Sequence, residues 1–315
     1  METKKPIIYQ DEQLPEIAAS IEQIGYAVVK IDTVDLTQLK QTFISELSYI
    51  ARDILELWTS DKFPEPVMPG LMGEYGLSQG NAAWQVRTDP TIQKVFAYLQ
   101  DTDDLVCSMD AVGYSPDNAK VSGSQWLHTD QNPEITGGDF KSLQGIFYAE
   151  DSYGDRAGTV VVPGSHKDYL DHNYFQPGHF QIVNHDKYWQ DAVKLEIPAG
   201  CILIYSSYLV HQGWHGPHRL CFMVSYGKKS DRSEEVRKAK IMMYLGGHRS
   251  THWSQFAQYH GRKWFYDTEW QILPSKLTCE RNTLLTHHLT SITTDPKAYR
   301  PEFDEFVPAD RLKLL

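Results

Sequence analysis

The chain has 315 residues, of which 41% are hydrophobic, 12% aromatic and 23% charged. This composition is typical of a folded globular protein and argues against intrinsic disorder. The 30 lysines and arginines are outnumbered by 41 acidic residues, which gives a formal net charge of −11 and disfavours nucleic acids and anionic membranes as partners. No apolar run is long enough to span a bilayer.

The cysteines and the N-terminus indicate a cytoplasmic protein. The 4 cysteines lie far apart and form no CxxC pair, so we expect reduced thiols rather than a disulfide framework or a zinc knuckle. The first residues contain no apolar core and therefore do not resemble a signal peptide. The oligomeric state has no signal in the sequence.

The N-terminal third of the chain has a helical pattern. Apolar residues recur at three- and four-residue spacing and predict helices over 14–24, 35–58 and 89–99. Gly25 should end the first helix, Asp35 or Thr37 should cap the second, and Pro90 suits the first turn of the third. The proline- and glycine-rich residues 64–80 predict a long loop.

From residue 104 onward the pattern changes to short apolar runs bounded by glycine, proline, asparagine or aspartate. Together with an earlier run at 26–31, they predict strands over 105–114, 122–129, 142–149, 159–162, 180–183, 201–205 and 220–226. Many short strands indicate a sandwich or barrel. The sequence contains no GxGxxG motif, which argues against a dinucleotide-binding fold. We predict a single domain over 1–315, with a helical flank at 1–103, a β core at 104–230 and a mixed helical extension at 231–315.

The histidines are confined to the later part of the chain, since all 13 follow residue 127. His128 and Asp130 are two apart in a predicted strand, so their side chains should share one face. Such a pair also arises by chance, and a pair on the protein surface is the common alternative. His211 follows an apolar run that starts at Gly200. We expect this run to form a strand that ends at His211 and brings its imidazole beside His128 and Asp130.

Two imidazoles and one carboxylate on one face form a 2-His-1-carboxylate triad, which suits Fe(II) and leaves coordination positions open. Zinc is chemically possible, but no HExxH-type motif supplies the general base that a hydrolytic site needs. His215 and His218 are alternatives to His211 as the third ligand. His166, in a Pro-Gly-Ser-His turn, is expected to make a structural hydrogen bond instead.

Two further side chains belong to this prediction. Trp126 shares the strand face of His128 and Asp130, and we expect it to pack in the core rather than to form a substrate platform. Arg219 opens the predicted strand that follows His211. A guanidinium inside a barrel needs a paired carboxylate, whereas the alternative is an arginine that faces water at the start of a strand.

A longer motif lies between these residues. Ser-Leu-Gln-Gly-Ile-Phe-Tyr-Ala-Glu-Asp, which starts at Ser142, leads into Ala-Gly-Thr-Val-Val-Val-Pro-Gly-Ser-His-Lys, which ends at Lys167. With the His-x-Asp pair and the distance from Gly200 to His211, it resembles the signature of the phytanoyl-CoA dioxygenase family of Fe(II)/2-oxoglutarate oxygenases. In that family a core strand runs into an acidic turn and then into Pro-Gly-Ser-His. The resemblance covers residues 125–226, and the helix, glycine and strand at 14–31 are also typical.

The resemblance implies a fold and a set of roles. The fold is mainly β with flanking helices, around a double-stranded β-helix (jelly-roll) core. His128 and Asp130 resemble the proximal iron ligands and His211 the distal one. Arg219 resembles the residue that binds the distal carboxylate of 2-oxoglutarate, although it lies eight residues after His211, where the family often has about ten. Gln144 stands where relatives often place a side chain near this cosubstrate.

The resemblance also implies a reaction. Fe(II), 2-oxoglutarate and O2 would hydroxylate an aliphatic C–H bond of a small-molecule or lipid-like substrate, and 2-oxoglutarate would be decarboxylated to succinate. A desaturation or other oxidative outcome on the same iron is one alternative. The other is a cupin-like binding protein without turnover, which the intact triad disfavours. His248, Arg249 and His252 could line a pocket, but a capped turn that enters a helix is the simpler interpretation.

Overall fold

The computed structural model describes residues 2–48, 70–72, 77–121, 125–136, 142–169, 180–255, 299 and 301–315. The chain divides into two compact units. Of the described residues, those within 2–32 and 114–221 form the first unit, and those within 33–48, 70–113 and 222–315 form the second. The single domain over 1–315 stays a prediction. None of the helices in the described ranges is long and apolar enough to cross a membrane.

The first unit contains a sheet of six strands. Their order is β1 (Glu2–Lys4), β11 (Val193–Leu195), β9 (Gly158–Val161), β13 (His211–Trp214), β7 (His128–Thr129) and β10 (Gln181–Ile182). β1 runs parallel to β11, and the pairs that follow across the sheet are antiparallel. Strands that are far apart in the chain are therefore neighbours in the sheet.

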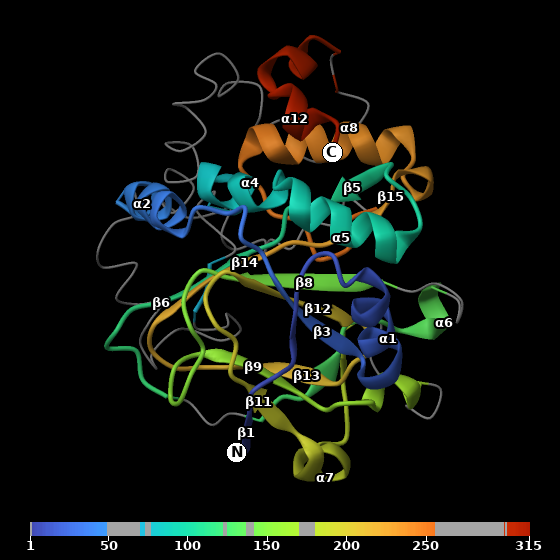
Figure 1. Cartoon of the computed structure of the whole chain (residues 1–315). Helices are drawn as coiled ribbons and strands as arrows, with labels where there is room; N and C mark the ends of the chain where they lie inside the picture. Colours follow the sequence, from blue (N-terminus) through green and yellow to red (C-terminus); the bar gives the residue numbers. More distant parts are fainter. Residues whose placement is uncertain are drawn as a thin grey trace. The chain divides into compact units, whose positions relative to one another are not determined.

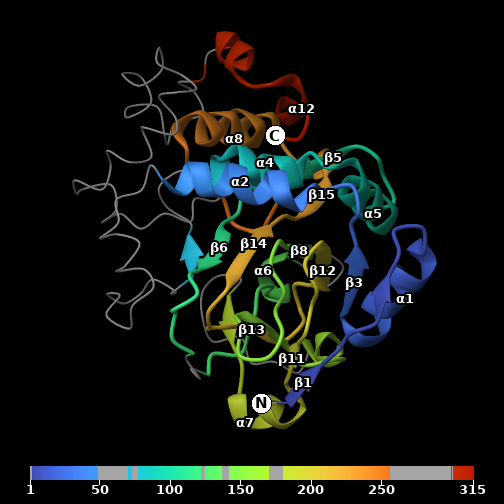
Figure 2. The ribbon, with the colours of Figure 1, turned by 60° about the vertical axis from the view of Figure 1, so that its left-hand side comes forward.

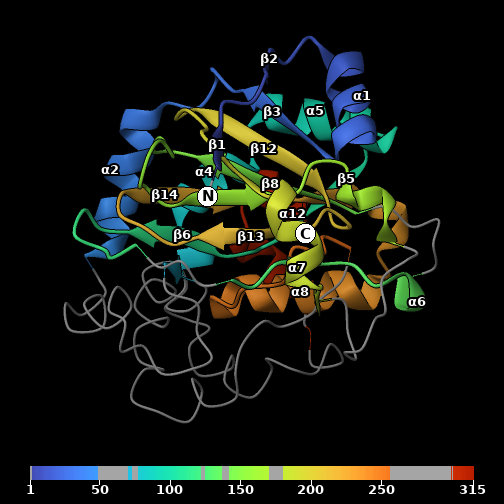
Figure 3. The same cartoon turned by 90° about the horizontal axis from the view of Figure 1, so that it is seen from below.

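A second sheet faces the first within this unit. Its order begins with β2 (Ile8–Tyr9), β3 (Tyr26–Lys30), β12 (Cys201–Ser206), β8 (Leu143–Tyr148) and β14 (Arg219–Met223), of which Arg219, Leu220 and Cys221 belong to this unit. Figures 1 and 3 show β3, β12 and β8 following one another across this layer, and Figure 1 shows β9 and β13 in the other. Between the layers, the hydroxyls of Tyr148 on β8 and Thr159 on β9 are hydrogen bonded at 2.7 Å. The predicted jelly-roll core, mainly β with flanking helices, is confirmed.

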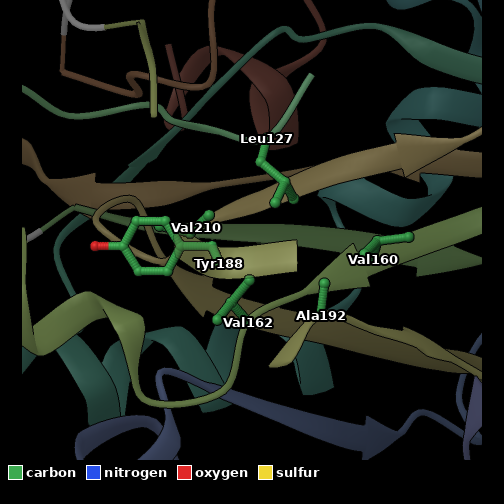
Figure 4. Close-up of a cluster of buried hydrophobic side chains, with 6 residues drawn as sticks. All are labelled: Leu127, Val160, Val162, Tyr188, Ala192 and Val210. Atoms are coloured by element: carbon green, nitrogen blue, oxygen red, sulfur yellow. The ribbon is translucent and has the colours of Figure 1, made fainter. Parts of the chain in front are cut away.

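The outer face of the six-stranded sheet buries an apolar cluster. Its buried side chains are Leu127, Val160, Val162, Tyr188, Ala192 and Val210 (Figure 4). Tyr188 ends the short helix α7 (His185–Tyr188). Because side chains alternate along a strand, residues that pack outward leave their neighbours pointing inward. Leu127 and Val210 thereby direct the adjacent His128 and His211 into the space between the sheets.

The helix α1 (Leu14–Ile24) ends at Gly25, as predicted. Gly25 has a φ of 88°, in the left-handed region that glycine adopts without steric cost. An added Cβ would lie 2.6 Å from Leu209 Cδ1 and 2.7 Å from His166 Nδ1. His166 also makes the structural hydrogen bond expected of it, between its Nε2 and Glu22 O at 3.0 Å.

The second unit is largely helical. Its longer helices are α2 (Leu36–Leu47), α4 (Asn81–Arg87), α5 (Pro90–Gln100) and α8 (Glu234–Gly246). Figure 2 shows α4 beside α2 and α8, and the rings of Trp84 and Tyr244 meet edge to face with centroids 5.4 Å apart. Short strands pair within this unit: β5 (Leu105–Cys107) with β15 (Tyr226–Lys228), and β4 (Leu71–Met72) with Val112 and Gly113 of β6 (Val112–Ser115).

Local capping explains where two of these helices begin. The Asp35 carboxylate accepts hydrogen bonds from the backbone N–H groups of Thr37 and Gln38, so Asp35 is the cap and Thr37 lies inside the helix. Asp89 caps α5 in the same way, with Pro90 at the first helical position. An aspartate at this position satisfies backbone donors that have no partner within the helix.

Two predicted strands are divided in the structure. The run at 105–114 forms β5 and β6, and Ser108 between them donates its N–H to Ser225 O at 2.8 Å instead of to a sheet neighbour. The run at 220–226 likewise forms β14 and β15. The strands at 26–31, 142–149, 159–162, 180–183 and 201–205 are confirmed within one residue at either end.

The structure also differs from the prediction at one helix and one strand. α4 was not predicted, because Ala82, Ala83, Trp84 and Val86 are all buried and leave no one-sided apolar pattern. In the described part of the predicted strand at 122–129, which covers 125–129, His128 and Thr129 are in a strand and 125–127 are not. Parts of several predicted segments lie outside the described residues: 49–58, 64–69, 73–76, 122–124, 137–140, 170–179 and 256–298.

Candidate metal centre

His128, Asp130 and His211 converge between the two sheets of the first unit. One potential ligand atom of each lies within 4.8 Å of the others. His128 and His211 are direct cross-strand partners on β7 and β13, and their ring centroids are 4.3 Å apart. The Asp130 carboxylate lies between the imidazoles, with Oδ1 3.4 Å from His128 Nε2 and Oδ2 3.2 Å from His211 Nε2. The structure thus brings together the three residues that the sequence singles out.

Backbone carbonyls fix the orientation of both imidazoles. His128 Nδ1 lies 3.1 Å from Trp126 O, and His211 Nδ1 lies 2.9 Å from Leu209 O. A carbonyl only accepts hydrogen bonds, so each Nδ1 bears a proton, and Nε2 is the nitrogen that presents a lone pair in the neutral imidazole. Burial, together with the neighbouring His211, lowers the pKa of His128 and favours its neutral form. This arrangement is the one in which a histidine binds a metal through Nε2.

His211 reaches this position differently from the prediction. It was expected to end the strand that starts near Gly200, but β12 ends at Ser206 and His211 opens the next strand, β13. The two strands are joined by a tight turn, in which Leu209 N–H donates to Ser206 O at 2.8 Å. The turn sends the chain from the second sheet to the first, where β7 lies.

The two alternative histidines lie elsewhere. His218 Nδ1 is 2.9 Å from Asp117 Oδ1, and both side chains are exposed to solvent. The His215 ring is stacked on Trp126, with centroids 6.3 Å apart. Neither residue joins the three converging side chains.

Arg219 is buried, with 7% of its surface exposed, so the alternative that it faces water is wrong. Its Nε donates to Cys221 Sγ at 3.2 Å, and no carboxylate among the described residues forms an ion pair with it. Burial by itself would lower the pKa of Arg219, but Cys221 and Tyr148 outweigh it and the pKa is raised. A buried guanidinium without a carboxylate is costly, so this site is suited to an anion from outside the chain.

Arg219 lies on the same side of the sheet as the triad. A Cβ added to Gly213 would be 3.9 Å from Arg219 Nη1 and 3.4 Å from the Trp126 ring. Gly213 is two residues beyond His211 in β13, so it points to the same inner face. An anion held by Arg219 would therefore lie near the converging ligand atoms.

The aromatic residues around the triad pack against His128. The Trp126 ring stacks on it with centroids 4.7 Å apart and planes 8° apart. Trp126 is partly buried, so its ring packs against the candidate ligand at the edge of the site and not in the core as expected. Phe180 contacts the same imidazole at 4.6 Å and is 37% exposed. Phe180 was not predicted to be a site residue; it lies immediately before the two-residue edge strand β10.

Gln144 contacts Asp130 directly. Its Nε2 donates to Asp130 Oδ2 at 3.0 Å and is also 3.1 Å from Ser207 Oγ, while Tyr205 donates its hydroxyl to Gln144 Oε1 at 3.0 Å. A contact between Gln144 and the cosubstrate stays a prediction. Tyr205 and Ser207 were not predicted to belong to the site, since only the pairing of β12 with β8 places Tyr205 opposite Gln144.

The histidines and arginine at 248–252 belong to the second unit. They follow Gly247, which caps the end of α8 with a φ of 73°, so the predicted capped turn ends a helix instead of entering one. Burial lowers the pKa of His248 to about 4. Its backbone carbonyl accepts a hydrogen bond from Gln79 Nε2 at 2.6 Å. A role for His248, Arg249 and His252 in lining a substrate pocket stays untested.

Part of the chain matches a known protein family. Residues 77–215 match the family model described as phytanoyl-CoA dioxygenase (PhyH), which confirms the resemblance seen in the sequence. Ava biosynthesis cluster protein O from Aspergillus versicolor is 26% identical over 174 residues, which are 49% of this chain and 55% of that protein. The chain therefore matches about half the length of this curated relative.

Solved structures were also found. The epimerase SnoN in complex with Fe3+, alpha ketoglutarate and nogalamycin RO is 15% identical, with a TM-score of 0.46 over 69% of this chain and 84% of that one. The non-heme alpha ketoglutarate dependent carbocyclase SnoK from nogalamycin biosynthesis is 15% identical, with a TM-score of 0.47 over 72% of this chain and 88% of that one.

Proposed function

From the phytanoyl-CoA dioxygenase pattern of residues 77–215, we infer that this protein is a non-haem Fe(II)/2-oxoglutarate-dependent dioxygenase. We propose that it hydroxylates an aliphatic C–H bond of a small-molecule or lipid-like substrate. When bound, iron, 2-oxoglutarate and O2 would together supply the oxidant for this step. The coproducts would be succinate and CO2. The protein's own residues bind and orient these groups and exclude competing reactions.

The observation that supports the proposal most strongly is the excess of acceptors at the triad. In the neutral imidazoles both Nε2 atoms present lone pairs, and the Asp130 carboxylate between them also accepts only. The Gln144 amide donates to Asp130 Oδ2 from one side, but the lone pairs of the three acceptors that face one another repel unless a cation lies among them. Two neutral imidazoles and one carboxylate are the donor set of non-haem Fe(II) oxygenases, and they leave coordination positions for other ligands.

Arg219 supports the choice of cosubstrate. Its buried guanidinium has a thiol partner but no carboxylate among the described residues. A carboxylate of 2-oxoglutarate would supply the missing counterion and accept charge-assisted hydrogen bonds from the guanidinium. His128, Asp130 and His211 would hold the metal, and Arg219 would hold the far end of the cosubstrate.

A small-molecule substrate has separate support. The curated relative is named for a biosynthesis cluster, and the exposed ring of Phe180 lies against His128. An aromatic edge beside the metal position suits an apolar part of a substrate. We also propose a cytoplasmic location, because Cys107, Cys201 and Cys221 are free thiols buried in the described part of the chain.

The test is an anaerobic titration with Fe(II) and 2-oxoglutarate, followed by the weak visible charge-transfer band of the chelate. We expect the band with the wild-type protein and its loss in His211→Ala. The matched control is His185→Ala, which removes a histidine from α7 on the outer side of the sheet and should keep the band. Absence of the band in the wild-type protein would contradict the proposal.

Turnover is tested by admitting air and measuring succinate. Release of succinate that depends on Asp130 supports the oxygenase. A band without succinate release would favour the binding protein without turnover. Identification of the oxidised product then separates hydroxylation from desaturation.

A further inference from the structure

Gln144 occupies a buried position between the sheets, beside the Asp130 carboxylate. It lies on β8, where the register of the sheet sets Tyr205 of β12 directly opposite, and it is 5% exposed. A buried amide requires partners for both its donor and its acceptor ends. Its side-chain hydrogen bonds lead to Asp130, Ser207 and Tyr205.

The chemistry of these partners fixes which way the amide points. Asp130 Oδ2 can only accept, so the Gln144 nitrogen must face it at 3.0 Å. At the other end, the Tyr205 hydroxyl donates to Gln144 Oε1 at 3.0 Å. A reversed amide would place its oxygen against the carboxylate and its nitrogen against a donor. The network therefore holds a single orientation.

Asp130 depends on this network because it lies beyond the regular strand. β7 ends at Thr129, so the ladder that fixes His128 does not fix Asp130. Its backbone N–H donates to Ser207 O at 2.9 Å, and Ser207 N–H donates to Ser142 O at 2.9 Å. Gln144 adds the bond to the side chain and a bond to Ser207 Oγ at 3.1 Å.

We propose that Gln144 is a positioning residue, whose amide holds the Asp130 carboxylate in the rotamer that ligates the metal. The proposal rests on the proposed metal site. The amide takes one lone pair of Oδ2, while Oδ1 lies 3.4 Å from His128 Nε2 and Oδ2 lies 3.2 Å from His211 Nε2. Tyr205 acts through Gln144, because its hydroxyl fixes the amide while its ring also contacts His211 with centroids 4.8 Å apart.

Replacement of Gln144 by leucine keeps a similar volume but removes the donor to Asp130. Outer partners of metal ligands typically contribute about 10- to 100-fold to metal affinity. We expect Gln144→Leu to weaken Co(II) binding within that range and to change the intensity and position of the cobalt d–d bands. Tyr205→Phe keeps the ring against His211 and should have a smaller effect of the same kind.

Combination of the two substitutions separates positioning from packing. If Tyr205 acts through Gln144, the double variant should bind Co(II) no more weakly than Gln144→Leu alone. The matched control is Gln100→Leu, since Gln100 is also buried but donates to Tyr226 O in the second unit. This control should lower thermal stability without moving the cobalt spectrum.

The outcomes distinguish this inference from the proposed function. A wild-type protein that binds no Co(II) or Fe(II) would overturn both. Wild-type binding with an unchanged affinity and spectrum in Gln144→Leu would overturn the positioning role alone. A loss of thermal stability equal to that of Gln100→Leu, with no change in the cobalt bands, would make Gln144 a packing residue.

Discussion

Arg219 offers the sharpest prediction, because its removal should affect stability and cosubstrate affinity in opposite ways. Its guanidinium is buried, is bonded to Cys221 Sγ through Nε, and has no carboxylate partner among the described residues. Burial of such a charge costs several kcal/mol unless a counterion is present. Arg219→Met retains much of the apolar volume, so the protein without cosubstrate should be as stable as the wild type or more stable.

Affinity for 2-oxoglutarate should fall. Truncation of one partner of a buried charge pair costs about 2–4 kcal/mol, which at about 1.4 kcal/mol per tenfold corresponds to roughly a 30- to 700-fold weaker affinity. Fe(II) binding should be retained, since the triad does not include Arg219. The assay is an anaerobic titration of the iron-loaded protein with 2-oxoglutarate, read at the charge-transfer band, with iron binding measured by equilibrium dialysis.

Lys194 provides the matched control. It is also a buried cation, but its Nζ donates to Ser152 O at 2.7 Å and to Gly154 O at 2.8 Å. Lys194→Met leaves both carbonyls without this donor. Each buried acceptor left unsatisfied lowers the free energy of unfolding by about 1–3 kcal/mol. This variant should lose stability in chemical denaturation and keep its affinity for 2-oxoglutarate.

Two results would refute the reasoning on Arg219. An unchanged affinity for 2-oxoglutarate in Arg219→Met would assign the carboxylate to another basic residue. A loss of stability as large as that of Lys194→Met would mean that the guanidinium is satisfied without a cosubstrate.

Three further predictions concern stability. Gly25→Ala should lower the free energy of unfolding by about 2 kcal/mol or more in denaturant titrations, because of the positive φ and because the new Cβ would meet Leu209 and His166; a neutral result would contradict both causes. Burial lowers the pKa of Lys240 from 10.5 to about 8, so the folded protein releases this proton before the unfolded chain does. The stability of the wild type relative to Lys240→Met should therefore rise between pH 8 and 10.5. A fall in relative stability over that range would contradict a lowered pKa of Lys240 in the folded protein. Val210→Ala, which removes two methyl groups from the outer cluster, should cost about 1–2 kcal/mol with Fe(II) affinity retained, and a loss of affinity would show that this packing also sets the ligand geometry.

Much of the local structure follows from short stretches of sequence. The helix over 14–24, its end at Gly25 and the cap at Asp35 depend on residues within a few positions of one another. Helix capping and left-handed glycine ends are local interactions, so the chain order alone reveals them. The strands that alternate clearly were also placed within one residue, since the side-chain period of two is local.

The three candidate ligands could also be singled out from sequence, but their arrangement could not. His128 and Asp130 are close in the chain, whereas His211 lies 81 residues after Asp130. The turn that makes His211 open β13 instead of ending β12 is decided by pairing with β7 and β9. A local apolar run cannot show where a strand changes sheets.

The sequence by itself determined the composition class, the helix ends and the residue types of a metal site. Only the tertiary structure decided that the Nε2 atoms face the Asp130 carboxylate, that Arg219 is buried without a counterion, and that Gln144 holds Asp130. The physical reason is that helix ends and strand alternation arise from neighbouring residues. Burial, tautomer and hydrogen-bond partner at the site arise instead from strand pairings between distant segments.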